Sequence, residues 1–355
     1  MDSAQLATLI GAFRGRTVAV IGDVVADEFV YGRIARVSRE APVLILEYDS
    51  REVVPGSAGN AANNVAALGG TATLVSILGR DDAGRRLTAA LHPGVDSRRI
   101  VRAPGIETTV KTRILAGGIH SAKQQVVRID RVVRNSTPRG ARDAFERAAF
   151  DAVRRADAVL MSDYGAGLVT PAFAARLRAQ LRREGHPIPI LIDSRYRLLE
   201  YRGLTACTPN EAEVEQALGL RINDDVRILE RAGREILRHT GMQAVLITRG
   251  SRGMALFVRD AAAVHIPIHG SDEIADVTGA GDTVMATMTL ALAAGATYEA
   301  AARLANFAGG VVVMKRGTAT VSANELRAAV DTATGPGNAD APRTGQRRAA
   351  GRRTR

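Results

Sequence analysis

The chain has 355 residues, of which 46% are hydrophobic and 24% charged, and its formal net charge is +11. This composition is that of a soluble globular protein with a sizeable core, and no run approaches the roughly 18 consecutive apolar residues of a membrane span. The single cysteine, Cys207, excludes an internal disulfide or a thiolate metal cluster. The first residues also lack a basic signal-peptide region, so we expect a cytoplasmic protein.

The positive charge is concentrated at the C-terminal end. Residues 336–355 hold six arginines and one acid, and so contribute +5 of the +11. This segment is rich in Gly, Pro, Ala and Arg and has no apolar period, which predicts a disordered basic tail after one domain over 1–335. A solvated extension is favoured over a nonspecific nucleic-acid contact, and no membrane partner is expected.

Apolar, β-branched runs alternate with helical stretches along most of the chain. The first run, 17–23, predicts a buried strand, and the next helix is expected to begin near Gly59 and to end at Gly69-Gly70. Further strands are predicted within 71–79, 157–163, 187–193 and 243–250, a hairpin within 253–268, and helices within 171–185, 225–241, 280–295 and 297–317, the last two being the final helices. This order predicts an α/β fold with a doubly wound, mostly parallel sheet that has helices on both faces.

Two stretches, 27–56 and 106–130, alternate apolar and polar residues with period two. This pattern predicts strands with one wetted face, too polar for the central sheet. We expect them to form a small second sheet that covers a cleft as a lid, built from residues 28–54 and 105–130.

Polar side chains follow the predicted strand ends. They are Asp23, Asp27, Asp163, Asp193, Asn210 and Arg249. Because ligands of open parallel sheets bind outside the carboxyl ends of the strands, the sequence predicts a site at this edge.

In the stretch DVTGAGDTVMA (276–286), three residues with little or no side chain, 279–281, precede the carboxylate of Asp282 at the start of the helix predicted within 280–295. If the helix begins near Gly279, the N–H groups of residues 279–282 form a pocket for an anion, and the helix dipole adds attraction. Asp282 could then deprotonate a hydroxyl facing the same phosphate, which suits phosphoryl transfer. From these residues alone, an ordinary helix-capping aspartate is the alternative.

Other common site patterns are missing from the sequence. It contains no GxxxxGK[ST], GxSxG, HExxH or CxxC. Their absence excludes a Walker-type P-loop and argues against the common hydrolase and zinc enzymes.

Two signatures together resemble those of the ribokinase-like (PfkB) carbohydrate kinases. The C-terminal one is DVTGAGDT (276–283), and the N-terminal one, about 220 residues earlier, is PGSAGNAANNVAALGG (55–70). The order of elements and TPNEAE (208–213) also match, and the resemblance covers roughly residues 10–330. It implies a ribokinase-like fold and a sugar kinase that uses ATP and Mg²⁺, and it allows for a monovalent cation.

Within that family the chain is most similar to the heptose-7-phosphate kinases of the ADP-heptose pathway. The likeness is carried by stretches such as KTRILAGGIHSAKQQVVRID (111–130), SDYGAGLV (162–169) and NFAGGVVVMKRGTATVS (306–322). It implies phosphorylation of the anomeric hydroxyl of a heptose 7-phosphate. Some members carry a fused nucleotidyltransferase domain, and this chain would correspond to the kinase part only.

The resemblance also implies roles for single residues. Asp282 matches the catalytic base, and the anion hole is matched by Gly279, Ala280 and Gly281. Asn210 and Glu213 match an NxxE motif that places Mg²⁺, with Glu213 as the metal-side carboxylate, although a first-turn helix acid is the alternative for Glu213. The nucleotide-binding positions are Thr248, Arg249, Gly250, Gly253, Asn306, Gly317 and Thr318.

On the sugar side, Asp27 matches an aspartate that binds sugar hydroxyls, and the neighbouring candidates are Gly56, Asn60 and Asn64. A helix cap at Asn60 and a turn at Gly56 are structural alternatives. A phosphorylated sugar also requires cations. From the lid stretches, we expect Lys111 and Arg113 to contact the substrate phosphate.

Three departures from the family patterns leave the acceptor open. Ser57 replaces a glycine of the N-terminal signature, Ala166 stands where heptose kinases commonly have lysine, and Arg195 lies in IDSRY instead of their Asp-Pro-Lys. The alternatives are a kinase of the ribokinase, ketohexokinase or ketodeoxygluconate kinase type, or a catalytically silent sugar- or nucleotide-binding regulator. We also expect a homodimer through the lid strands, because a small two-sided sheet is poorly stable alone.

Overall fold

A computed structural model describes residues 3–117, 123–132, 137–270 and 276–334. Its main sheet has nine strands in the order β15-β14-β13-β12-β11-β10-β1-β4-β6. The strands are β1 (Thr17–Gly22), β4 (Thr71–Val75), β6 (Val95–Asp96), β10 (Ala158–Asp163), β11 (Ile190–Ser194), β12 (Ala206–Cys207), β13 (Ala244–Thr248), β14 (Met254–Val258) and β15 (Val264–Ile266). All neighbours pair in parallel up to β13, and β14 and β15 add an antiparallel edge.

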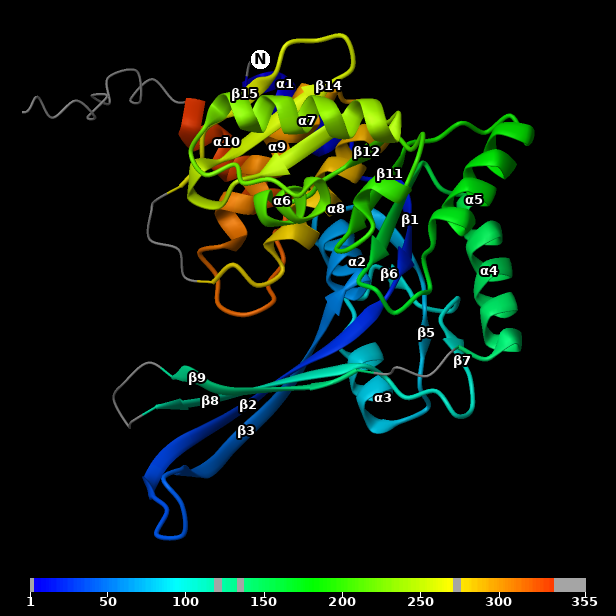
Figure 1. Cartoon of the computed structure of the whole chain (residues 1–355). Coiled ribbons are helices and arrows are strands. Elements are labelled where there is room, and N and C mark those ends of the chain that lie inside the picture. The colour runs from blue at the N-terminus through cyan, green and yellow to red at the C-terminus, as the bar shows by residue number, and fades with distance from the viewer. Residues whose placement is uncertain (1–2, 118–122, 133–136, 271–275, 335–355) are drawn as a thin grey trace, which may run out of the picture.

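Helices cover both faces of this sheet (Figure 1). One face carries α1 (Ser3–Gly11), α2 (Ala58–Ala67), α8 (Ala280–Ala293), α9 (Tyr298–Val312) and α10 (Ala323–Thr334). The other carries α4 (Arg139–Val153), α5 (Pro171–Arg183), α6 (Glu211–Leu218) and α7 (Val226–Thr240). Successive residues of a strand pack into the hydrophobic cores on opposite faces of the sheet. In β1, Val18 and Val20 pack on the face with α2 and α8, whereas Ala19 and Ile21 pack on the face with α4 and α5. This explains why the strands are continuous apolar runs.

A separate four-stranded sheet has the order β3-β2-β8-β9. Its strands are β2 (Val24–Val37), β3 (Leu44–Ser57), β8 (Val110–Gly117) and β9 (Gln124–Arg131). Figure 1 shows it projecting away from the body as a long arm. We call it the second sheet. A short connecting region contains α3 (Asp82–Ala89), β5 (Ile77–Leu78) and β7 (Val101–Arg102), and two single 3-10 turns cover Leu198–Glu200 and Gly250–Arg252.

The predicted α/β architecture is confirmed, including the hairpin of β14 and β15. One expectation was wrong: α9 is followed by a further helix, α10. Its start is marked by Ser322 and Glu325, whose side chains exchange hydrogen bonds with each other's backbone N–H groups. The S-x-x-E pattern of this capping box is present in the sequence at 322–325.

Within the described residues, no helix is both long and apolar enough to span a membrane. The basic tail predicted over 336–355 lies outside the described residues.

Candidate active site

The start of α8 leaves backbone donors facing open space. Gly279 is the N-cap residue with φ 78°, a left-handed conformation that favours glycine, and a Cβ there would lie 2.6 Å from Asn60 Nδ2. At Gly281 an added Cβ would meet no described atom within 4 Å. The N–H groups of Gly281 and Asp282 have no backbone acceptor among the described residues. These two groups are therefore available to an anion.

Ala280 departs from the predicted anion hole. Its N–H donates to Val277 O at 3.2 Å and closes the turn that leads into the helix. The described geometry thus leaves the N–H groups of Gly279, Gly281 and Asp282 without a backbone acceptor, with Ala280 serving to shape the turn.

Asp282 lies in the first turn of α8 and is only 5% exposed. Asn60 Nδ2 donates to its Oδ2 at 2.9 Å, and the Tyr164 hydroxyl donates to its Oδ1 at 3.2 Å. Burial raises the pKa of Asp282 to about 7, against the lowering effect of these two hydrogen bonds. A carboxyl with a pKa near neutral pH is suited to accept a proton from an alcohol.

The two asparagines of α2 support this carboxylate from inside the protein. Asn60 also donates to Gly279 O at 3.2 Å, which links α2 to the α8 turn. Asn64 is fully buried, and its Nδ2 donates to Asn60 O and Oδ1 while its Oδ1 accepts from Thr283 and Val321. Asn64 thus holds Asn60 in place, and its burial corrects the expectation that it contacts the substrate directly.

Asp27 and Arg113 form a partly buried ion pair, with Arg113 Nη1 2.5 Å from Asp27 Oδ1. Gly56 packs against the same carboxylate, since a Cβ there would lie 2.3 Å from Asp27 Oδ2. The expected sugar-binding residues Asp27 and Gly56 are therefore adjacent. Arg113, expected at a substrate phosphate, is already neutralised by Asp27.

A cavity of about 210 Å³, the small cavity, opens at the start of α8. It is lined by Tyr164, Asp193, Arg195, Thr208, Asn210, Glu213, Thr248, Val277, Gly279, Gly281 and Asp282. Asn210 and Glu213 form a capping box at the start of α6, so Glu213 has the first-turn helix role considered as its alternative. Both residues nevertheless line the cavity.

The acidic lining of the small cavity fits a divalent cation. Burial raises the pKa of Glu213, and burial together with Glu213 and Asp282 raises that of Asp193. Within the described residues, no cluster of three or more His, Cys, Asp or Glu side chains forms a closed metal site. Mg²⁺ needs none, because it commonly binds through one or two carboxylates, waters and substrate phosphates.

The predicted nucleotide-binding residues surround the β13–β14 turn and the loop after α9. Gly250 and Gly253 have positive φ values, and a Cβ at Gly253 would lie 2.1 Å from Ile266 O. Asn306 donates to Pro267 O at 2.9 Å, and Gly317 N donates to Asp276 Oδ2 at 2.9 Å. Arg249 pairs with Glu211 at 2.7 Å, so its charge is already neutralised. Thr318 has a buried hydroxyl without a partner among the described residues.

A second cavity of about 710 Å³, the large cavity, adjoins the small one, and Tyr164 and Arg195 line both. Its cationic lining residues are Lys111, Arg128, Arg142 and Arg195. Arg128 pairs with Asp130, and Arg142 donates to Gly167 O. Lys111 and Arg195 form no ion pair within the described part of the chain, and burial lowers the pKa of Lys111. Arg142 likewise has no acidic partner among the described residues, so Lys111, Arg142 and Arg195 are the cations left available to an anionic ligand.

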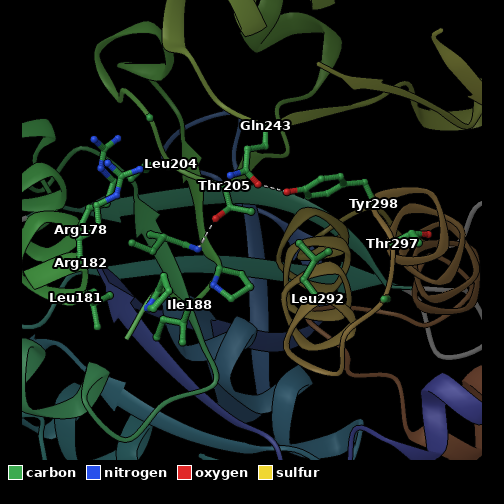
Figure 2. Close-up of a pocket in the computed structure, with 15 residues that line it drawn as sticks. Arg178, Leu181, Arg182, Ile188, Leu204, Thr205, Gln243, Leu292, Thr297 and Tyr298 are labelled. Atoms are coloured by element: carbon green, nitrogen blue, oxygen red, sulfur yellow. Dashed lines mark hydrogen bonds between the residues drawn. The ribbon is translucent and has the colours of Figure 1, made fainter. Parts of the chain in front are cut away.

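A further cavity of about 580 Å³ lies at the opposite edge of the sheet, where β11, β12 and β13 begin (Figure 2). There Thr205 Oγ1 accepts from Ile190 N at 2.9 Å, and the Tyr298 hydroxyl donates to Gln243 Oε1. It contains none of the predicted site residues. Because the ligands of parallel sheets bind at the carboxyl ends, the small and large cavities form the candidate active site.

Tyr164, Asp193 and Arg195 line this site, although no catalytic or binding role was predicted for them from the sequence. All three lie in or directly after β10 or β11. Position at a strand end was the available signal for them, but it does not reveal which side chains meet the α8 turn.

The comparisons with known proteins agree with this fold. The family model described as pfkB family carbohydrate kinase matches residues 16–325. The chain therefore belongs to the pfkB family of carbohydrate kinases, a family of ATP-dependent enzymes.

Curated relatives named Bifunctional protein HldE are similar over most of the chain. The relative from Caulobacter sp. (strain K31) is 44% identical over 326 residues, covering 90% of this chain and 64% of its own length. The relative from Geobacter metallireducens is 40% identical over 328 residues, covering 92% of this chain and 65% of its own length. The chain thus spans about two thirds of the length of these relatives.

Solved structures with low sequence identity share the fold. Arabidopsis thaliana ribokinase complexed with ribose and ATP has a TM-score of 0.68 at 18% identity, covering 89% of this chain and 99% of that chain. Escherichia coli phosphofructokinase-2 in complex with fructose-6-phosphate has a TM-score of 0.66 at 17% identity, covering 89% of this chain and 98% of that chain. The ribokinase-like fold is confirmed.

Replacing Asp282 with Asn will stabilise the fold at neutral and alkaline pH. Burial raises the pKa of the carboxyl from its ordinary value of 3.8 to about 7. Between these two pH values the unfolded state loses the proton more readily than the folded state, so the free energy of unfolding falls as the pH rises. Asparagine avoids this cost, which linkage puts at a few kcal/mol once the group is ionised. Urea unfolding at pH 5 and pH 8 should show a gain that is larger at pH 8.

Asp276→Asn is the matched control. Hydrogen bonds from the Thr278 side chain and from two backbone N–H groups lower the pKa of Asp276, so replacing this carboxylate should reduce stability at pH 8. A loss of stability at pH 8 in Asp282→Asn as well would contradict the assignment of a raised pKa to Asp282.

Proposed function

We propose that this protein transfers the γ-phosphate of ATP to the anomeric hydroxyl of a heptose 7-phosphate. The observation that carries the proposal is Asp282, a buried carboxyl with a pKa of about 7 beside the available N–H groups of the α8 start. A base near its operating pH and an anion pocket in one turn are the two requirements of phosphoryl transfer to an alcohol.

The chemistry assigned to these residues is a direct displacement. The oxygen of the sugar hydroxyl bonds to the γ-phosphorus while Asp282 accepts the proton of that hydroxyl. The bond between the γ-phosphorus and the oxygen of the leaving ADP breaks. The N–H groups of Gly281 and Asp282 and the dipole of α8 stabilise the charge on the transferred group. Mg²⁺ at Asn210 and Glu213 would supply neutralisation of the phosphate charges.

The large cavity supports a phosphorylated acceptor. Lys111 and Arg195 lie in it with neither an ion pair nor a side-chain hydrogen bond among the described residues, whereas Arg113 is paired with Asp27 and Arg142 donates to Gly167 O. We therefore assign the sugar phosphate to Lys111 and Arg195, and Asp27 to sugar hydroxyls. The heptose is supported by the stretches that resemble the heptose-7-phosphate kinases, such as 111–130 and 306–322, and the similar relatives carry the name Bifunctional protein HldE. The N–H group of Gly250 and the side chains of Asn306 and Thr318 would adjoin the nucleotide, while Gly253 closes the turn by donating its N–H to Gly250 O.

Asp282→Asn should retain ATP binding and lose phosphoryl transfer. Removing the base is expected to reduce kcat by about 10³-fold, because general-base catalysis contributes about 10²–10⁴. Calorimetry with ATP and an ADP-release assay measure the two properties separately. Turnover within tenfold of the unmodified protein would rule out Asp282 as the base.

A panel of sugars and sugar phosphates will identify the acceptor. We expect heptose 7-phosphate to be preferred, and Lys111→Gln to raise its KM at least tenfold because one cationic contact to phosphate is lost. Lys123→Gln is the control, since Lys123 pairs with Asp49 on the second sheet, outside both cavities. Preference for unphosphorylated ribose or ketoses would overturn the heptose-phosphate assignment, and ATP binding without turnover on any acceptor would favour a silent regulator.

We also propose that the second sheet mediates a homodimer. Its apolar side chains are exposed, including Leu44, Tyr48, Val127 and Ile129 at 45%, 68%, 48% and 54%. An uncovered apolar surface of this kind on a thin sheet marks an interaction site.

Light scattering should therefore give the mass of a dimer for the unmodified chain and of a monomer for the Val127→Asp/Ile129→Asp double variant. Val226→Asp changes an equally exposed valine on α7 and should leave the dimer intact. A monomeric unmodified chain would refute the proposal.

A further inference from the structure

Tyr164 stands where the two cavities of the candidate active site meet. Its hydroxyl donates to Asp282 Oδ1 at 3.2 Å, and the Lys111 ammonium lies 5.7 Å from the centre of its ring. It lines the small cavity beside Asp282 and the large cavity beside Lys111. One side chain thus contacts both the proposed base and a cation proposed to bind the acceptor.

The loop that carries Tyr164 is held by two buried aspartates. Asp23 Oδ2 accepts from Tyr164 N and Ala166 N, both at 3.0 Å. Asp163 accepts from Gly165 N at 3.2 Å, and its Oδ2 also accepts from the Tyr201 hydroxyl at 2.7 Å. Asp23 and Asp163 are 3% and 1% exposed.

This arrangement is costly for a simple connection between β10 and α5. Burial raises the pKa of Asp23 to about 6, and its Oδ1 has no hydrogen-bond partner among the described residues. Burying a carboxylate costs free energy unless it is fully hydrogen-bonded. The loop is therefore held in one conformation, in which the Tyr164 hydroxyl reaches Asp282.

Asp282 is held from two sides. Asn60 holds Oδ2 and is itself held by Asn64, while Tyr164 holds Oδ1. Both donors favour the ionised carboxyl over the protonated one. Three other titratable groups interact electrostatically with Asp282: Asp27 on β2, Lys111 on β8 and Asp193 on β11.

We propose that Tyr164 is a positioning residue that orients the Asp282 carboxylate and keeps it ionised for proton transfer. The catalytic part of this inference rests on the proposed kinase function. The hydroxyl does not itself exchange a proton with the substrate in this scheme. It fixes the direction of the carboxylate, so that the oxygen facing the acceptor hydroxyl is presented in its deprotonated form.

Tyr164→Phe tests the proposal in the kinetics. Loss of the hydrogen bond removes an interaction that lowers the pKa of Asp282, so that pKa should rise from its value of about 7. Since the base must be deprotonated, the acidic limb of the kcat profile should move to higher pH by about 0.5–1 unit. At the pH optimum kcat should fall about tenfold, while KM for ATP changes less than about twofold.

Tyr298→Phe is the matched control. Its hydroxyl donates to Gln243 at the opposite edge of the sheet, as Figure 2 shows, so the same chemical change is made away from the active site. This variant should keep both kcat and the pH profile. An acidic limb that stays in place in Tyr164→Phe, or moves equally in Tyr298→Phe, would overturn the proposal.

A double-mutant cycle tests the contact without any substrate. Unfolding temperatures at pH 8 are compared for the unmodified chain, Tyr164→Phe, Asp282→Asn and the double variant. Tyr164→Phe should lower the temperature by about 2 °C or more in the unmodified background, and by clearly less when residue 282 carries no charge. Equal losses in both backgrounds would refute the coupling, whatever the kinase assays give, so this result is separable from a failure of the proposed function.

Discussion

The burial of one carboxylate at the start of α8 is the constraint around which the candidate active site is arranged. Asp282 is removed from water, yet it is held by a donor on each oxygen. Burial alone would favour the protonated acid, and the two hydrogen bonds oppose it, leaving a pKa of about 7. The protein accepts a loss of stability here in exchange for a group that can accept a proton at neutral pH.

The donors that hold Asp282 come from distant parts of the chain because the parallel sheet gathers its strand ends at one edge. Asn60 lies in the first turns of α2, and Tyr164 lies in the loop after β10. The β1–β10 pairing places Asp23, at the end of β1, beside the backbone of that loop. The parallel sheet thus fixes the relative positions of the proposed base, its hydrogen-bond donors and the surrounding cavities.

The second sheet contributes to the site from outside this frame. Asp27 and Lys111 are register partners across β2 and β8, so one pair of strands delivers a carboxylate and a cation to the same end of the sheet. Arg113 lies two residues further along β8, and it pairs with Asp27 instead of remaining available for a ligand. The difference in role between Lys111 and Arg113 follows from this pairing, although both residues are cations on the same strand.

The sequence by itself determined the α/β class, the parallel sheet and most of its strands and helices, because each depends on a local apolar period and on turn residues. It also determined the family and the proposed base, because the DVTGAGDT and PGSAGN signatures are contiguous in the chain. Only the tertiary structure decided the role of Asn64 as a buried support, the neutralisation of Arg113 by Asp27, and the contact of Tyr164 with Asp282. These depend on which side chains meet across strands and helices, and burial and partner choice are set by packing that no single stretch of sequence contains.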